Sequence, residues 1–178
     1  MNLSDLSVQR MTSADANSQL GDLRFFLDEA FGGDFSDEDF DHAFGGTHFA
    51  ILTQGRLVAH GSVVMRQITF DERAYATGFV EAMAVGRDWR GRGVGSKLLA
   101  DLTDFCRSNF AVAMLSTGSH AFYEKHGWRR FNGESYLATD AGAVRTEEDD
   151  DGLMLLTSLE HVLAADRVTC DFRSGDVW

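Results

Sequence analysis

The chain has 178 residues, 44% of them hydrophobic and 25% charged, which is typical of a single soluble globular domain spanning residues 1–178. Its formal charge of −12 at pH 7 disfavours binding to nucleic acid or to an anionic membrane, and favours cationic partners. No apolar run approaches the roughly 20 residues that cross a bilayer, and the first ten residues lack a signal-peptide core. With only two cysteines and no disulfide framework, we expect a cytoplasmic location.

The first third of the chain predicts two helices and a hairpin. Apolar residues recur every three or four positions from Leu20 to Phe31, which predicts a helix that the following glycines end. Ser36 and Asp39 have the spacing of a capping box, which opens a second, short helix. Two apolar runs on either side of Gln54-Gly55 then predict a β-hairpin.

The rest of the chain mixes strands and helices. After a turn at "FDER", a strand is expected from Thr77 to Val85, followed by the glycine-rich "RGRGVGSKLL" and an amphipathic helix. An apolar strand over 110–116 and a short helix at "SHAFYEKHGW" come next. Further strands are expected at "WRRF" and "RVTCDF", and the acidic run "EEDDDG" between them is followed by the apolar "LMLL". Antiparallel hairpins with one strand–helix–strand unit predict an α+β, or mixed α/β, sheet protein.

The glycine-rich loop between the strand and the helix has the chemistry of a diphosphate site. Amides at a helix start lack intrahelical partners, and glycines let the backbone approach a phosphate closely. The spacing fits neither G-x-x-x-x-G-K-[ST] nor G-x-G-x-x-G. It does fit R-x-x-G-x-G, on Arg90, Gly93 and Gly95.

This loop, the preceding "VEAMAV" and the later "FYEKHGW" together resemble the GCN5-related N-acetyltransferases (GNAT), which bind acetyl-CoA. The resemblance implies a central, mostly antiparallel twisted sheet flanked by helices, with a splayed strand pair that binds acetyl-CoA. It implies that Tyr123 protonates the leaving CoA thiolate, although a tyrosine packed on the sheet is the alternative. The cofactor contacts that it implies are Met83, Ala84, Val85, Arg90, Gly91, Arg92, Gly93, Val94, Gly95 and Ser96.

Acyl transfer to an amine requires a base, since only the neutral amine attacks a thioester. Glu81 is the candidate, because a carboxylate in the middle of an apolar strand is poorly solvated unless it faces a cleft. A structural ion pair is the alternative role for Glu81. The backbone amide of Met83 is the expected donor to the oxyanion.

Three segments narrow the resemblance to the aminoglycoside 2'-N-acetyltransferases, which inactivate these antibiotics. They are "FGGDFSDEDFDHAFGG", "VEAMAV" and above all the final "CDFRSGDVW". The resemblance implies a cationic aminoglycoside as substrate and, since relatives commonly pair, a homodimer. The implied drug-binding residues are Asp34, Asp39, Glu81, Ser116, Asp151, Asp176 and Trp178 with its terminal carboxylate. The choice of Asp151 over Asp149 and Asp150 stays open.

Two other functions remain possible from the sequence. One is a GNAT enzyme for a peptide or another polyamine-like substrate, and the other is a CoA- or drug-binding module without catalysis. Which aminoglycosides are accepted is also open. No metal site is expected, because the histidines are scattered singly.

Overall fold

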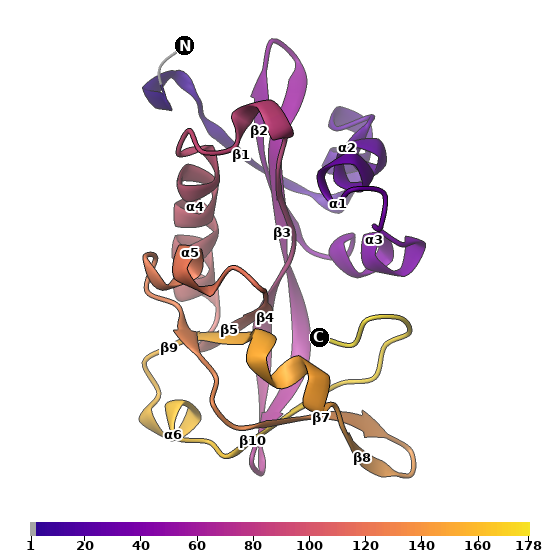
Figure 1. Ribbon diagram of the computed structural model, residues 1–178, viewed down its shortest axis with the longest axis vertical. Coiled ribbons are helices and arrows are strands. Elements are labelled where there is room, and N and C mark those ends of the chain that lie inside the picture. The colour runs from indigo at the N-terminus through magenta and orange to yellow at the C-terminus, as the bar shows by residue number, and fades with distance from the viewer. Residues whose placement is uncertain (1–2) are drawn as a thin grey trace. The chain divides into compact units, whose positions relative to one another are not determined.

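The chain divides into two compact units, and residues 3–178 are described by the computed structural model (Figure 1). The first unit comprises the residues up to Val64 together with Val80–Asp104. The second comprises Met65–Phe79 together with Phe105–Trp178. The single domain expected from chain length stays a prediction.

The first unit joins a strand pair and three short helices to the start of a long helix. Its elements are η1 (Leu3–Asp5), β1 (Val8–Thr12), α1 (Ser13–Gln19), α2 (Leu23–Ala30), α3 (Asp37–Ala43), β2 (Thr47–Thr53), parts of β3 (Arg56–Phe70) and β4 (Arg73–Val85), η2 (Arg87–Trp89) and part of α4 (Val94–Asn109). Strand β2 pairs antiparallel with both β1 and β3. One core cluster of this unit contains Met11, Ala16, Leu20, Leu23, Leu27, Phe35, Ala50 and Ala84.

The helix predicted from Leu20 to Phe31 is wrong in its extent. Within this range the structure has only α2, which begins at Leu23, and Leu20 instead caps the end of α1, donating its amide to the Ala16 carbonyl at 2.8 Å. A turn at Gly21 and Asp22 separates α1 from α2. The buried leucines of the predicted pattern still face the core, so the periodicity identifies the buried face although the helix is interrupted.

The capping box and the hairpin are both confirmed. The Ser36 hydroxyl accepts from the Asp39 amide while the Asp39 carboxylate accepts from the Ser36 amide, each at 3.0 Å. In the hairpin, Gln54 and Gly55 have φ angles of 50° and 75°. Two successive positive φ angles in a two-residue turn match the twist of the strands that flank it.

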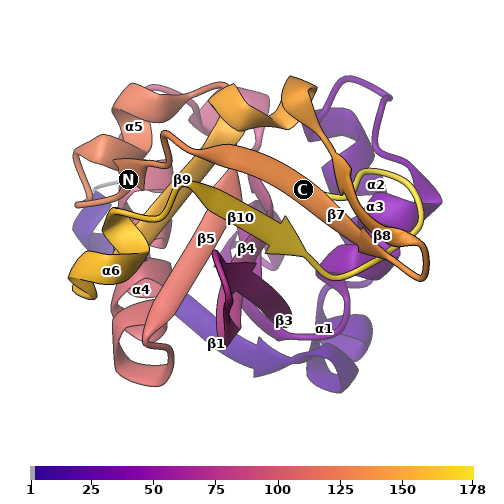
Figure 2. The same cartoon turned by 90° about the horizontal axis from the view of Figure 1, so that it is seen from below.

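The second unit is built around a larger set of strands. Its elements are the remaining parts of β3, β4 and α4, then β5 (Val112–Ser116), α5 (His120–Glu124), β6 (Arg129–Arg130), β7 (Glu134–Thr139), β8 (Gly142–Arg145), η3 (Glu147–Gly152), β9 (Leu153–Thr157), α6 (Glu160–Leu163) and β10 (Arg167–Cys170). The strand order is β6-β9-β5-β4-β3-β10-β7-β8. Figure 2 shows β10 lying beside β7, to which it is parallel.

The pairing confirms a mixed, mostly antiparallel sheet protein flanked by helices. Parallel ladders join only β4 to β5 and β10 to β7 among the pairs that the described residues form. The ladder between β4 and β5 covers two residue pairs, Gly78 with Ala113 and Phe79 with Met114. None of the helices over residues 3–178 has the length and apolar character needed to cross a membrane.

Candidate active site

The last residues of β4 form an irregular, half-buried strand end in the first unit. Ala82 has a φ of 48°, a left-handed conformation that is uncommon for a residue with a Cβ. Around it, Glu81 and Met83 are partly exposed and Ala84 is buried. The Glu81 carbonyl lies 3.5 Å from the Ser62 hydroxyl, and the Ala82 carbonyl lies 3.2 Å from Nδ1 of His60. The predicted base and the predicted oxyanion donor therefore flank a residue with a positive φ angle.

The loop that follows β4 has the geometry expected of an anion site. Gly91 and Gly93 have φ angles of 71° and 80°, and α4 begins directly afterwards at Val94. The first turn of α4 contains no acidic residue. The amides at this helix start, with the positive end of the helix dipole, therefore meet no neighbouring carboxylate in that turn.

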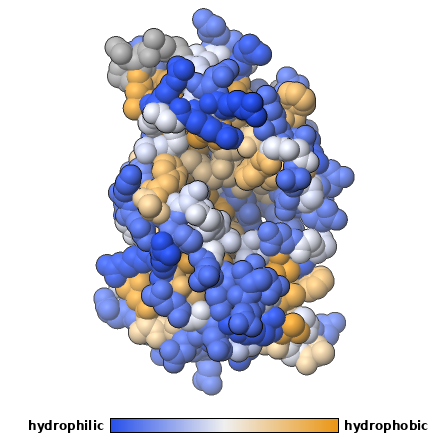
Figure 3. Space-filling model, in the orientation of Figure 1, coloured by the Kyte–Doolittle hydropathy of each residue, from blue (hydrophilic) through white to orange (hydrophobic). Residues whose placement is uncertain are grey.

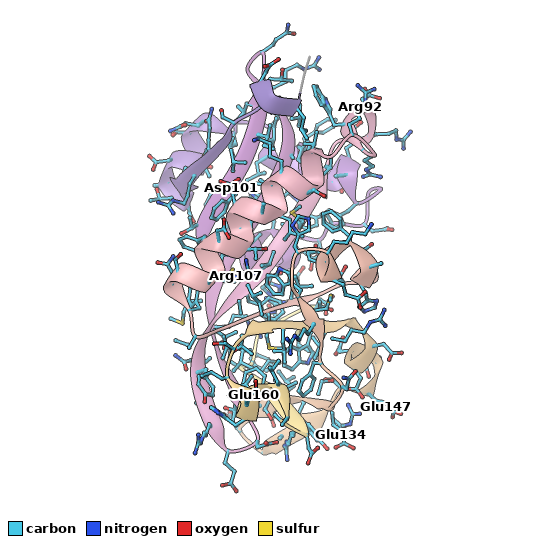
Figure 4. The ribbon with its side chains drawn as sticks, turned by 90° about the vertical axis from the view of Figure 1, so that its left-hand side faces the viewer. Arg92, Asp101, Arg107, Glu134, Glu147 and Glu160 are labelled. Carbon is cyan, nitrogen blue, oxygen red and sulfur yellow. The ribbon has the colours of Figure 1, made fainter. Side chains whose placement is uncertain are left out.

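The two arginines of the loop have different surroundings. Arg90 donates from Nε to the Val85 carbonyl at 2.9 Å and from Nη2 to the Ala30 carbonyl at 2.7 Å, so its guanidinium ties the loop to β4 and to the end of α2. Arg92 lies 6.0 Å from the centre of the Trp89 ring and projects outward beside the start of α4 (Figure 4). Arg90 shapes the loop, whereas Arg92 is placed at its surface.

These groups fit the diphosphate of a CoA thioester. A Cβ on Gly91 would meet nothing within 4 Å, so the backbone there is open to a ligand. The loop supplies amides, two arginines and a helix start in one short segment. That donor set suits phosphate oxygens.

Tyr123, the predicted acid, lies in α5 of the second unit. Its side chain is 7% exposed and packs edge-on against Phe122 and Trp128. Burial raises the pKa of the Tyr123 phenol to about 12, opposed by a hydrogen bond with Thr117. At neutral pH the group holds its proton, as a proton donor must.

The acidic run at 147–152 forms a 3-10 helix, η3, which belongs to the hydrophilic surface below the centre of Figure 3. Its three aspartates have different surroundings. Asp150 accepts from Arg145 and from the amide and hydroxyl of Ser135, and these contacts lower its pKa. Asp151 is exposed. The Asp150 carboxylate therefore stabilises the fold through these hydrogen bonds, whereas the Asp151 side chain is not fixed in this way.

Asp149 differs from both of its neighbours. Its pKa is raised, first by burial and then by the charges of Asp176 and Glu148. Like charges close together disfavour ionisation of each carboxyl group. Asp149 thus belongs to a group of acids whose mutual repulsion a bound cation would relieve.

The C-terminus is docked within the second unit. Trp178 is 4% exposed, and its indole Nε1 donates to the Thr146 hydroxyl at 3.0 Å. Arg66, itself 4% exposed, donates to the Val177 carbonyl at 2.9 Å and to the Asp171 carboxylate at 2.9 Å. A buried arginine with these partners fixes the path of the final residues, so Trp178 is a packed residue and not a frayed end.

The remaining predicted drug contacts vary in their environment. Ser116 is exposed at the end of β5, and a Cβ on Gly152 would lie 2.7 Å from its Oγ, so Ser116 abuts the end of η3. Asp176 is exposed, and its carbonyl accepts from Arg173 at 2.9 Å. In the first unit Asp34 is exposed, whereas Asp39 is engaged in capping α3.

The expectation that the histidines are scattered singly is wrong for two of them. His48 and His60 are fully buried in the first unit, with Nδ1 of His48 3.0 Å from Nε2 of His60. The pair lies on adjacent antiparallel strands, where Ala50 is opposite His60 and His48 is opposite Ser62. The register of the hairpin is the signal that could have brought them together.

Comparison with known proteins places these features in context. The sequence profile of the acetyltransferase (GNAT) family matches residues 17–128. The chain is 40% identical over 171 residues to an aminoglycoside 2'-N-acetyltransferase of Mycolicibacterium fortuitum, covering 92% of this chain and 87% of that protein.

Two solved structures are similar in fold. A GNAT family N-acetyltransferase (YhbS) from Escherichia coli, crystallised in complex with CoA, has a TM-score of 0.60 at 12% identity and covers 93% of this chain and 89% of that one. A conserved protein of unknown function from Enterococcus faecalis V583 has a TM-score of 0.60 at 17% identity over 72% of this chain, which spans only 33% of the larger protein.

Proposed function

The chain belongs to the acetyltransferase (GNAT) family, whose acyl donor is acetyl-CoA, and from that membership we propose that it acetylates the 2'-amine of aminoglycoside antibiotics by direct attack of the amine. The Mycolicibacterium fortuitum relative, alike over nearly the whole chain, supports the aminoglycoside as substrate. In a bacterium this reaction confers resistance, since acetylation removes one positive charge from the drug.

Acetyl-CoA supplies an acetyl thioester, and the chain supplies the acid–base groups. Glu81 accepts a proton from the 2'-ammonium, directly or through water, which makes the amine nucleophilic. The Met83 amide donates to the thioester oxygen as negative charge develops on it. Tyr123 donates its phenolic proton to the departing sulfur. Its buried side chain, with a pKa of about 12, keeps that proton available at neutral pH.

Carboxylates hold the cationic substrate. An aminoglycoside carries several ammonium groups, and each needs an acceptor once it is partly desolvated. We assign Asp176 and the terminal carboxylate of Trp178 to this role, with Ser116, Asp34 and the outer oxygen of Asp39. Among the neighbouring aspartates, we favour Asp149 over Asp151 as the drug contact. Burial, and after it the charges of Asp176 and Glu148, raise the pKa of Asp149, and a bound ammonium would offset the repulsion between these acids.

The observation that carries this proposal is the buried C-terminal tryptophan. Two hydrogen bonds hold the terminal residues in a defined place: the Trp178 indole donates to Thr146, and Arg66 donates to the Val177 carbonyl. Because the indole is packed, the terminal carboxylate is held in a fixed place where it can bind a ligand, whereas a frayed terminus would not hold it there.

The test compares kanamycin B, which has a 2'-amine, with kanamycin A, which has a hydroxyl there. After incubation with acetyl-CoA, mass spectrometry should show one added acetyl group on kanamycin B and none on kanamycin A. Equal acetylation of both drugs would contradict the 2' position. Acetylation of basic peptides but of neither drug would indicate another amine substrate, and CoA binding without any transfer a non-catalytic module.

A homodimer and a cytoplasmic location complete the proposal. Size-exclusion chromatography with light scattering should give twice the monomer mass of 19.7 kDa. Expression in a susceptible bacterium should raise resistance to kanamycin B but not to kanamycin A, and cell fractionation should recover the protein in the cytoplasm.

A further inference from the structure

A series of polar contacts through two buried histidines leads from Ser13 at the start of α1 to Ala82 in β4, entirely within the first unit. The Ser13 hydroxyl lies 3.2 Å from Nε2 of His48, whose Nδ1 lies 3.0 Å from Nε2 of His60. Nδ1 of His60 lies 3.2 Å from the Ala82 carbonyl. Both imidazoles are 0% exposed, so water does not compete for these contacts.

The order of the protons along this series of contacts follows from its last member. A carbonyl only accepts, so Nδ1 of His60 carries the hydrogen and Nε2 of the neutral ring is the acceptor. His48 then donates from Nδ1 to that nitrogen, which leaves its own Nε2 without a hydrogen. The Ser13 hydroxyl faces this Nε2 and also the carbonyls of Phe44 and Gly46, at 3.3 and 3.2 Å, so three acceptors share its one hydrogen. Burial lowers the pKa of His48 to about 4 and of His60 to about 3, so both rings are neutral at pH 7.

The Ala82 carbonyl, at the end of this series of hydrogen bonds, belongs to the same peptide as the Met83 amide, which is the proposed oxyanion donor. The Ala82 carbonyl and the Met83 amide are parts of one planar trans peptide, so their C=O and N–H bonds point in opposite directions. Holding the carbonyl toward His60 therefore aims the Met83 N–H away from the histidine. Donation from His60 also polarises the peptide and strengthens its N–H as a donor.

The backbone at Ala82 needs such support. Ala82 has a φ of 48°, a conformation that is unfavourable for a residue with a Cβ and persists only where the surroundings enforce it. On the β3 side, a Cβ on Gly61 would lie 3.2 Å from the Met83 sulfur, so β3 approaches this part of β4 closely. His60 and Gly61 are thus consecutive residues that shape this part of β4.

We propose that His60, oriented by His48 and Ser13, is a positioning residue that fixes the Ala82–Met83 peptide and so aims the Met83 amide at the thioester oxygen. The inference rests on the proposed function for the role of the Met83 amide. The hydrogen-bond order along Ser13, His48 and His60 does not depend on that function and can be measured by itself.

The first experiment records long-range ¹H–¹⁵N spectra of the imidazoles in the wild-type protein at pH 7. We expect both His48 and His60 as the neutral tautomer with hydrogen on Nδ1. Hydrogen on Nε2 of His60, or a charged ring, would overturn the proposal even if the enzyme acetylates aminoglycosides as proposed.

The second experiment compares His60→Asn with His60→Leu. The Asn side-chain NH₂ can occupy the place of Nδ1 and donate to the Ala82 carbonyl, whereas Leu cannot. Loss of a full oxyanion donor costs about 10²–10³ in kcat, so a misaimed donor in His60→Leu should lower kcat about tenfold. The KM values for both substrates should stay within about twofold, and His60→Asn should recover most of the rate.

A matched control separates positioning from general destabilisation. His161→Leu removes an exposed histidine that hydrogen-bonds Tyr75 in the second unit, and it should leave kcat unchanged. If His60→Leu retains the wild-type kcat, or if folded His60→Asn loses as much as His60→Leu, the proposal is wrong. If His60→Leu does not fold, the imidazole spectra and His60→Asn still decide.

Discussion

Burial sets the protonation of three side chains that bear on the chemistry. Tyr123 is 7% exposed and its pKa is raised to about 12, while burial lowers the pKa of His48 to about 4 and of His60 to about 3. Each shift has desolvation of the charged form as its main cause. All three groups are therefore neutral near pH 7, where the phenol is a proton donor and the imidazoles are hydrogen-bond relays.

Replacing Tyr123 by Phe removes the phenolic hydroxyl and keeps the ring packed against Trp128. General acid catalysis contributes about 10²–10⁴ to rate, and water can replace part of it, so kcat should fall about 10- to 100-fold with little change in the KM for acetyl-CoA. Steady-state release of CoA thiol measures both values. Tyr136→Phe, at a tyrosine whose hydroxyl bonds Glu134, should leave kcat unchanged. A wild-type rate in Tyr123→Phe would remove Tyr123 from the mechanism.

The histidine pair makes stability depend on pH. In the unfolded chain each histidine titrates near 6.5, but in the folded protein the pKa falls to about 4 for His48 and about 3 for His60. Above pH 6.5 both histidines are neutral in the folded and the unfolded state, so they do not lower the free energy of unfolding. Below it the unfolded state gains protons that the folded state does not, and stability falls until the pH passes the folded pKa values.

Urea unfolding of wild type and of His48→Gln at pH 7.5 and pH 5 measures this dependence. Each pKa unit corresponds to 1.36 kcal/mol, so at pH 5 each histidine lowers the free energy of unfolding by about 2 kcal/mol relative to pH 7.5. His48→Gln should lose less stability on acidification than wild type by about that amount. Equal losses in both proteins would mean that His48 titrates normally in the folded state.

The loop before α4 depends on backbone freedom at Gly91. Its φ is 71°, and a Cβ would meet nothing within 4 Å. Alanine there adds about 1 kcal/mol of backbone strain and places a methyl group on the open side of the loop, where we place the diphosphate. Gly91→Ala should therefore raise the KM for acetyl-CoA about tenfold and leave the KM for the aminoglycoside nearly unchanged.

Gly32→Ala is the matched control for that variant. Gly32 has a φ of 79°, and a Cβ added there would also meet nothing within 4 Å, so the strain is similar while no acetyl-CoA contact is proposed at this site after α2. Thermal unfolding should show comparable losses of stability in the two variants. A KM for acetyl-CoA that rises equally in both would assign the effect to strain and not to the diphosphate.

Elements with a strong local signal could be predicted from the sequence, and weakly patterned edges could not. The β2–β3 hairpin follows from Gln54-Gly55 between apolar runs, and α3 from its capping box. Strand β1 was missed because Met11 is its one buried residue, and β8 because none of its residues is buried. An edge strand that buries little shows no alternation of polar and apolar residues.

The candidate site likewise has residues that could be predicted from the sequence and residues whose surroundings could not. The glycine-rich loop is a local motif, so its residues could be named in advance. The distinct surroundings of Asp149, Asp150 and Asp151 could not, because Arg145, Ser135 and Asp176 are brought near them only by the fold. Three adjacent aspartates look equivalent in a sequence, but their partners come from different elements.

The whole molecule carries a formal charge of −12, a field that favours a polycation such as an aminoglycoside and opposes the anionic acetyl-CoA. Arg90, Arg92 and the start of α4 concentrate positive charge and dipole in one loop, whereas 28 acidic residues are spread along the chain. The two substrates should therefore respond to salt in different ways.

Screening tests this at the scale of the molecule, because the Debye length shortens from about 10 Å at 0.1 M salt to about 3 Å at 1 M. Raising NaCl from about 0.05 M to about 0.5 M should increase the KM for kanamycin B several-fold, while the KM for acetyl-CoA changes less. Asp149→Asn should reduce this salt dependence. Asp101→Asn removes the same charge from the outward side of α4, labelled in Figure 4, and should leave it nearly intact. A KM for kanamycin B that does not vary with salt would mean that apolar and neutral contacts hold the drug. Equal effects of Asp149→Asn and Asp101→Asn would mean that the electrostatic field comes from acids all over the molecule and not from those around Asp176.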